Sequence, residues 1–140
     1  MIKLSRMSDY AVVVLETLCR QDSAALSASQ IAVDSKLPEP TVAKVLKLMA
    51  AGGIVTSSRG ANGGYALARA PQLINVFEIV SCIEGRLSLT ACVEGGDEPC
   101  ALSGACAMTG RWDVVNEAVR KAFSDITLAD MLVATKKKVA

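Results

Sequence analysis

The spacing of apolar residues changes at Gly52-Gly53, and this change is the strongest constraint on the fold. Before the two glycines, apolar residues recur at every third or fourth position, which is the period of an amphipathic helix. After them, residues 54–58 and 65–68 are rich in β-forming side chains and flank a glycine-rich turn, which predicts a hairpin. The helical stripes that we expect to be buried are Ala11, Val14, Leu15 and Leu18 in a first helix and Val42, Val45, Leu46 and Met49 in a later one.

Capping signals mark where helices of the first half begin. Ser8 or Asp9 is placed to cap the first helix. Ser27 and Gln30 form a capping box, which opens a short second helix that we expect to end near Lys36. The first half is therefore predicted to hold one longer helix followed by a short one.

A proline-containing turn leads from the short helix into a third helix. Pro40 suits the first helical position because the N–H that proline lacks would have no partner there. Thr41, Lys44 and Lys47 face away from the buried stripe of this helix. A helix has the right width to enter the major groove of DNA, so these three residues are candidates for DNA contacts.

The hairpin that follows carries Arg59 and Asn62 in its glycine-rich tip, which can approach the DNA backbone or minor groove closely. Helix, short helix, turn, amphipathic helix and hairpin is the order of a winged helix-turn-helix. Residues 1–69 carry eight basic and five acidic side chains, an excess that permits DNA binding without demanding it. In the alternative interpretation the lysines form an ordinary solvated face, since similar folds also serve as protein-binding modules.

The second half is predicted to be helical as well. Asn75 and Glu78 form a box-like start for a linking helix. Residues 111–123 form a long amphipathic helix whose small apolar side chains are either core or a dimer interface. The predicted fold class is mostly α with a small β-hairpin, a winged helix-turn-helix plus a long dimerisation helix. The predicted divisions are the winged helix-turn-helix at 1–70, the linking helix and loop at 71–90, a cysteine loop at 91–107, the dimerisation and C-terminal helices at 108–135, and a basic tail at 136–140.

The cysteine loop holds Cys92, Cys100 and Cys106, in a chain without any histidine. Thiolates are soft donors suited to an iron–sulfur cluster or to zinc, and three reduced, exposed thiols without a ligand are the alternative. A structural zinc site takes four ligands, so Asp, Glu, a small molecule or a residue of another chain would have to supply the fourth. Cys19 and Cys82 lie on predicted helices and are expected to behave as small hydrophobes.

Several functions and locations are excluded by what the sequence lacks. The apolar run of residues 2–18 breaks at Glu16, far short of a membrane span, so we expect no membrane span and no membrane partner. The stretch also has no small-residue cleavage site, so we expect no signal peptide. We expect a cytoplasmic location, where clustered cysteines indicate metal or redox chemistry more often than disulfides. The sequence shows neither a nucleophile paired with a base nor a phosphate loop, so we expect no enzyme and no small-molecule substrate.

Four features together resemble one family over nearly the whole chain. They are Met7-Ser8-Asp9-Tyr10-Ala11-Val12, Arg59-Gly60-Ala61-Asn62-Gly63-Gly64-Tyr65, the cysteine triad, and Ile126-Thr127-Leu128-Ala129-Asp130. With these features the chain resembles the IscR/NsrR/RirA-type winged-helix iron–sulfur transcription regulators, and within them most closely the regulators of SUF-type Fe–S assembly operons. The resemblance implies a homodimer that binds a double-stranded DNA operator, mostly as a repressor, with an affinity set by a cluster that reports iron, oxygen or nitric oxide status.

The same resemblance implies that Cys92, Cys100 and Cys106 hold the cluster, and one position departs from the pattern. The IscR branch has a histidine three residues after its last cysteine, where this chain has Thr109. The nitric-oxide-sensing branch uses an aspartate on the first helix of the partner subunit, and Asp9 stands at that position. The implied fourth ligand is therefore the partner subunit's Asp9, with a 4Fe–4S cluster favoured over 2Fe–2S. A helix cap is the alternative role of Asp9, and an iron–sulfur carrier or assembly protein without DNA binding is the alternative function.

Overall fold

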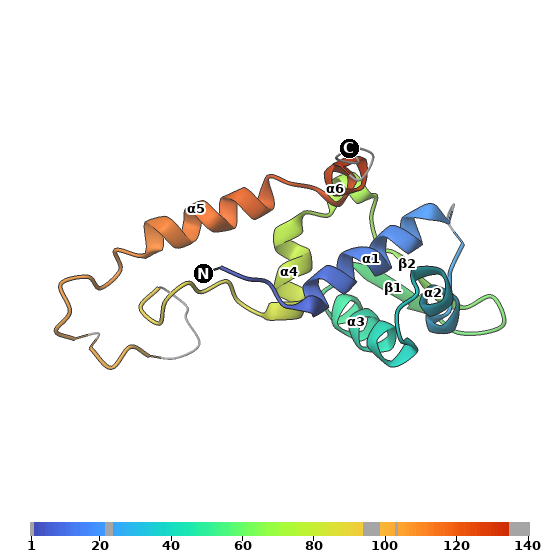
Figure 1. The fold of residues 1–140 in the computed structure, drawn as a ribbon, viewed down its shortest axis with the longest axis horizontal. Coiled ribbons are helices and arrows are strands. Elements are labelled where there is room, and N and C mark those ends of the chain that lie inside the picture. Colours follow the sequence, from blue (N-terminus) through green and yellow to red (C-terminus); the bar gives the residue numbers. More distant parts are fainter. Residues whose placement is uncertain (1, 22–23, 94–98, 103, 135–140) are drawn as a thin grey trace.

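The computed structural model describes residues 2–21, 24–93, 99–102 and 104–134. These residues form a mostly helical fold with one antiparallel two-stranded hairpin (Figure 1). The predicted order of elements in the first half is therefore correct. Along the chain the elements are α1 (Arg6–Arg20), α2 (Ala28–Ser35), α3 (Glu39–Ala51), β1 (Val55–Ser58), β2 (Gly64–Leu67), the 3-10 helix η1 (Pro71–Leu73), α4 (Val76–Glu84), α5 (Asp113–Ser124) and α6 (Leu128–Ala134).

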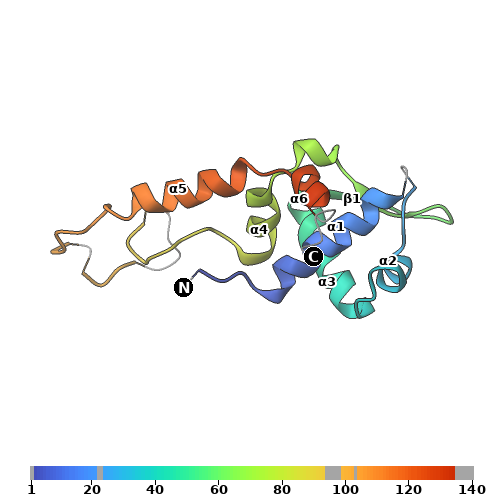
Figure 2. The same ribbon diagram turned by 45° about the horizontal axis from the view of Figure 1, so that its top comes forward.

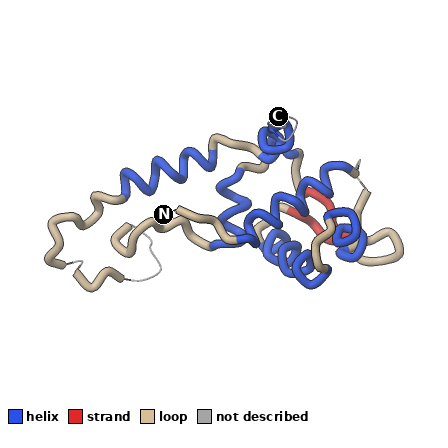
Figure 3. The backbone as a smooth tube through the Cα atoms, viewed as in Figure 1, coloured by secondary structure: helices blue, strands red, loops and turns tan. Residues whose placement is uncertain are grey.

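The core lies where α1, α2 and α3 meet the hairpin, with α4 and α6 closing it from the other side (Figures 2 and 3). Both stripes predicted from the helical period, on α1 and α3, are buried. Burying a large aliphatic side chain contributes about 1.5–3 kcal/mol, so these stripes supply much of the stability of the first half. The largest side chains that are fully buried are Leu15, Ile31, Leu46, Met49, Ile54, Ile74, Ile79 and Leu128.

Both of the predicted capping boxes are present. The Ser27 side chain accepts a hydrogen bond from the Gln30 N–H, and the Gln30 side chain accepts one from the Ser27 N–H, at the start of α2. Asn75 and Glu78 make the same reciprocal pair at the start of α4. Each pair satisfies two backbone donors that would otherwise lack partners, which explains why both helices begin where the sequence predicts.

The start of α1 differs from the prediction. The helix begins at Arg6 with Ser5 as its N-cap residue, so Ser8 and Asp9 lie inside the first turn and neither caps the helix. The prediction that Ser8 or Asp9 caps α1 is therefore wrong. Ser8 is instead buried, and its hydroxyl donates to Glu84 of α4, a partner far away in the sequence.

The starts of α3 and α5 shift by one or two residues. α3 begins at Glu39, which puts Pro40 at the second helical position instead of the first. Either position lacks an intrahelical partner for its N–H, so the proline costs no hydrogen bond. α5 begins at Asp113, because residues 107–112 form turns. None of the α5 residues is buried in the single chain.

The hairpin, which we call the wing, is tied to the segment before α2. β1 and β2 pair with Val55 opposite Leu67. Leu26 adds an isolated bridge, since its N–H donates to the Tyr65 carbonyl at 3.0 Å and the Tyr65 N–H donates to the Leu26 carbonyl at 2.7 Å. Gly64 has a φ of +147°, and a Cβ there would overlap the Leu26 backbone. The start of β2, next to the tip of the wing, is therefore fixed against the residue that precedes the α2 capping box.

α5 extends away from the winged helix-turn-helix, and both ribbon views place residues 104–112, which lead into it, at its far end (Figures 1 and 2). The chain returns to the core at α6, where the Leu128 N–H donates to the Ile74 carbonyl at 2.8 Å. A reciprocal pair between Thr127 and Asp130 starts α6, at the Thr-Leu-Ala-Asp sequence that predicts a helix start. Among the described residues, no helix is both long and apolar enough to cross a membrane.

Candidate functional site

The exposed face of α3 is the first part of the candidate site. Lys44 and Lys47 are exposed, and Thr41 is half-buried near the start of the helix. The opposite face packs into the core through Val45 and Met49. The lysine side chains therefore project from a rigid helix, as a helix that enters the major groove requires.

The tip of the wing is the second part. Arg59 and Asn62 are both exposed. Between them Gly60 has a φ of +105°, and a Cβ at Gly63 would overlap the Ser58 carbonyl oxygen. The tip therefore needs glycine at these two positions to make its turn, and the turn leaves both polar side chains in solvent.

The cysteine loop is the third part, and all three of its thiols are free. Cys92 and Cys100 are half-buried and Cys106 is exposed. The Cys92 sulfur lies 3.2 Å from the Thr90 hydroxyl, and the Cys106 sulfur accepts a hydrogen bond from the Met108 N–H at 3.4 Å. Within the described residues, no three His, Cys, Asp or Glu side chains are grouped so that they could bind a metal ion. The single chain therefore supplies soft donors in one loop without bringing them together.

The structure describes two of the positions considered for the fourth ligand, Asp9 and Thr109. Asp9 is exposed in the first turn of α1, directly after the buried Ser8. Thr109 makes a local turn, in which its hydroxyl donates to the Cys106 carbonyl at 2.9 Å. The acidic alternatives within the loop are outside the described residues: Glu94, Asp97 and Glu98.

Cys19 and Cys82 differ from the loop cysteines. Burial raises the pKa of both thiols, and Glu16 near Cys19 and Glu78 near Cys82 raise it further. A Cβ at Gly52 would overlap the Cys82 sulfur, so α4 packs closely against the end of α3. A raised pKa leaves less thiolate for metal binding, in agreement with the prediction that these two cysteines are structural.

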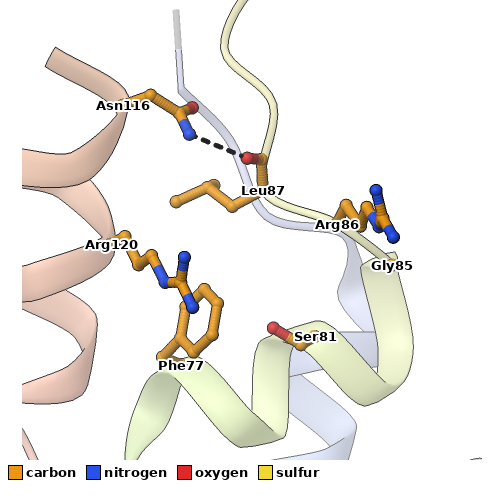
Figure 4. A pocket seen from close by; sticks show the side chains of 7 residues that line it. All are labelled: Phe77, Ser81, Gly85, Arg86, Leu87, Asn116 and Arg120. Atoms are coloured by element: carbon orange, nitrogen blue, oxygen red, sulfur yellow. Dashed lines mark hydrogen bonds between the residues drawn. The ribbon is translucent and has the colours of Figure 1, made fainter. Parts of the chain in front are cut away.

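A cavity of about 480 Å³ lies between α4 and α5 (Figure 4). Side chains of α5 contact α4 and the segment that follows it. Asn116 donates to the Leu87 carbonyl, and the Arg120 guanidinium lies 4.9 Å from the centre of the Phe77 ring. The cavity is lined by Phe77, Ser81, Gly85, Arg86, Leu87, Asn116 and Arg120.

Two residues join segments that are distant in sequence, and neither contact is predicted from the sequence. Ser8 links α1 to α4, and Asn116 links α5 to residues 87–89. Ser8 sits on the same stripe as Ala11 and Leu15, and a hydroxyl on a buried stripe needs a hydrogen-bond partner. That pattern could have indicated a tertiary contact, although not its partner Glu84. Asn116 lies within an ordinary amphipathic pattern, and no local signal marks it.

A profile of the Rrf2 family, described as iron-dependent transcriptional regulators, matches residues 4–134. The chain belongs to the Rrf2 family. It is 32% identical over 136 residues to the HTH-type transcriptional regulator NsrR of Bacillus licheniformis, a match that covers 94% of this chain and 92% of that protein. The family is one of transcription regulators, so this Rrf2 protein is a DNA-binding transcription regulator and not an enzyme.

Two solved structures share the fold of this Rrf2 protein. CymR, the global cysteine regulator of B. subtilis, is 27% identical with a TM-score of 0.69, and the match covers 96% of this chain and 98% of that one. IscR of T. potens is 28% identical with a TM-score of 0.68, covering 99% and 93%. The predicted winged helix-turn-helix, with its mostly helical class and its small hairpin, is confirmed.

Proposed function

We propose that this Rrf2 protein is a homodimeric repressor whose affinity for operator DNA depends on an iron–sulfur cluster bound to its cysteine loop. Its targets would be Fe–S assembly genes, and its signal iron, oxygen or nitric oxide status. The observation that carries the proposal is the free state of Cys92, Cys100 and Cys106 in one loop outside the winged helix-turn-helix. The description of the family as iron-dependent supports it.

Operator DNA would be read by α3 and the wing. Thr41, Lys44 and Lys47 would meet phosphates and base edges in the major groove, where a helix fits. Arg59 and Asn62 would reach the backbone or the minor groove from the wing tip. The exposure of both lysines and of both wing residues supports this role.

The second copy of the chain would pack along α5. Val114 is 77% exposed and Val115 44% exposed in the single chain, and Trp112 at the start of the helix is 41% exposed. The small apolar side chains of this helix, Val115, Ala118, Val119 and Ala122, are likewise not buried, which argues against their being core. A twofold dimer would present two reading helices to paired half-sites, as DNA-binding dimers do.

The donor set fits an iron–sulfur cluster. Thiolates of Cys92, Cys100 and Cys106 are the soft ligands that such clusters take, and a bound cluster would supply a redox-sensitive and oxygen-sensitive centre. Three thiolates leave one iron of a 4Fe–4S cluster without a cysteine, and the partner subunit's Asp9 would bind it. The exposure of Asp9, and its freedom from a capping role, support this assignment. A 2Fe–2S cluster remains the alternative.

The predicted divisions of the chain follow the same roles, with residues 1–70 for DNA, 71–90 as link, 91–107 for the cluster and 108–135 for the dimer. The basic tail at 136–140 lies outside the described residues. A cytoplasmic location would keep the loop thiols reduced, as metal binding requires.

Anaerobic purification tests the proposal. We expect iron and acid-labile sulfide in the protein, a visible absorption band, and a dimer by sedimentation. DNA selected from a random pool by the cluster-bound protein should bind with a different affinity after the iron is removed with a chelator. An iron–sulfur carrier would contain the cluster but retain no DNA sequence in the selection, and a regulator of another kind would select DNA without containing iron.

A further inference from the structure

α5 is attached to the rest of the chain in an unusual way, because none of its residues is buried in the single chain. Its middle is held by a side-chain amide instead. The Asn116 Nδ2 donates to the Leu87 carbonyl at 3.1 Å (Figure 4), and the Asn116 Oδ1 accepts from the Leu89 N–H, also at 3.1 Å. One side chain therefore satisfies a backbone acceptor and a backbone donor two residues apart.

The segment bound in this way leads directly into the cysteine loop. Leu89 is followed by Thr90, whose hydroxyl lies 3.2 Å from the sulfur of Cys92. The Ser88 hydroxyl donates to the Thr90 carbonyl at 2.9 Å, which stiffens the same short stretch. Fixing Leu89 therefore restricts where the first thiol of the loop can lie.

The other end of the segment is fixed to a different helix. Glu84, the last residue of α4, accepts hydrogen bonds from the Ser5 N–H at 2.9 Å and from the Ser8 hydroxyl at 2.6 Å. The stretch between Glu84 and Leu89 is thus anchored to α1 at its beginning and to α5 at its end. A displacement of this stretch would therefore change its hydrogen bonds to both helices.

We propose that Asn116 is a positioning residue for Cys92. Its amide holds residues 87–89 against α5, and this contact sets the position of the first thiol relative to the helix. The inference rests on the proposed function where it concerns the cluster. The contact with Leu87 and Leu89 is a property of the chain itself.

The chemistry of the side chain supports this role. Asparagine is a poorer helix former than alanine, so alanine would serve α5 better if the helix alone mattered. Only an amide of this length offers one donor and one acceptor here. A carboxylate at position 116 would still accept from Leu89 but would face the Leu87 carbonyl oxygen without a proton to donate.

The first test uses the protein without iron. We expect Asn116→Ala to speed hydrogen exchange of the Leu89 amide about fivefold, the factor expected for one lost hydrogen bond. Iodoacetamide should alkylate Cys92 faster in this variant than in the natural protein, as followed by mass spectrometry. The rate of alkylation of Cys106 should not change. Glu117→Ala, at an exposed neighbouring position of α5, is the matched control and should change neither rate.

Asn116→Asp separates positioning from a general effect on the helix. It keeps the acceptor for Leu89, so protection of that amide should be largely retained, while the link to Leu87 is lost. It also gives a readable result if Asn116→Ala fails to fold. Unchanged Leu89 exchange and unchanged Cys92 alkylation in Asn116→Ala would overturn the inference. An equal increase in the alkylation rates of Cys92 and Cys106 would also overturn it, because it would indicate that the whole loop had become more mobile.

The second test uses the cluster-bound protein in air. We expect the visible absorbance of Asn116→Ala to decay several-fold faster than that of the natural protein and of Glu117→Ala. A natural decay rate in Asn116→Ala would contradict the role toward the cluster. Absence of iron from the natural protein would instead reject the proposed function, and the exchange and alkylation rates would still decide whether Asn116 positions Cys92.

Discussion

The hydroxyl of Ser8 donates a hydrogen bond of 2.6 Å to the carboxylate of Glu84, across 76 positions of sequence. The bond joins the first turn of α1 to the last residue of α4. α1 belongs to the winged helix-turn-helix, and the chain beyond Glu84 leads to the cysteine loop. The hydrogen bond therefore connects the winged helix-turn-helix, the candidate DNA-binding part, to the segment that leads into the cysteine loop, the candidate cluster-binding part.

Replacing Ser8 with alanine should destabilise the protein moderately. The hydroxyl is buried and bonds a charged group, but Glu84 itself is exposed and retains the Ser5 N–H. We expect the free energy of unfolding in urea to fall by about 1 kcal/mol. Ser29→Ala, at an exposed position of α2, should change it by less than about 0.5 kcal/mol. Equal losses in the two variants would contradict a specific bond to Glu84.

The same pair predicts a pH dependence. Hydrogen bonds from Ser5 and then Ser8 hold the pKa of Glu84 below its ordinary value of 4.5. A lowered pKa means that the bonds stabilise the folded protein fully above the ordinary value and lose this effect as the pH falls through the lowered pKa. The difference in unfolding free energy between the natural protein and Ser8→Ala should thus be constant near neutral pH and shrink in acid. A difference that grows in acid would argue against the carboxylate as acceptor.

Lys44→Ala and Lys47→Ala should each weaken DNA binding through loss of a phosphate contact. For each lysine that meets a phosphate, the slope of log affinity against log salt should become shallower by about one. Fluorescence anisotropy with a selected duplex and with a random duplex measures both slopes. Lys121→Ala on α5 is the control and should leave the slope unchanged. A slope that stays the same in Lys44→Ala would remove that lysine from the interface.

Asp9→Asn tests the fourth ligand. Because Asp9 does not cap α1, the substitution should alter stability only through the helix dipole, by less than about 1 kcal/mol. We expect the visible absorbance in air to decay faster than in the natural protein, and Asp9→Cys to slow the decay. A natural spectrum and lifetime in Asp9→Asn would move the search for the ligand to Glu94, Asp97 and Glu98 of the loop or to a bound small molecule.

Patterns between residues close together in the sequence predict most of the fold. The stripe from Val42 to Met49 and the capping boxes at Ser27 and Asn75 depend on neighbours within one or two turns, and all are present. Contacts between distant segments were missed. The position of Ser8 before the first apolar stripe indicates a helix cap, because the sequence gives no sign of its distant partner Glu84.

The contacts that distant segments make with the wing and with α5 are likewise not predicted from the sequence. The bridge from Leu26 to Tyr65 involves a single residue, too short to produce an alternating pattern. Asn116 bonds to a segment 27 to 29 positions earlier, which no helical period encodes. For the cysteine loop, residue type alone indicated the ligand chemistry, whereas its geometry depends on long-range contacts that spacing does not specify.

The most direct measurement of the central claim is the iron and acid-labile sulfide content of five single Cys→Ala variants, each purified without oxygen as a folded dimer. We expect Cys92→Ala, Cys100→Ala and Cys106→Ala to lose both iron and sulfide together with the visible absorption. Cys19→Ala and Cys82→Ala should match the natural protein, because their thiols pack against helices outside the loop. Loss of iron in Cys82→Ala together with full iron and sulfide in Cys100→Ala would contradict the assignment of the cluster to this loop.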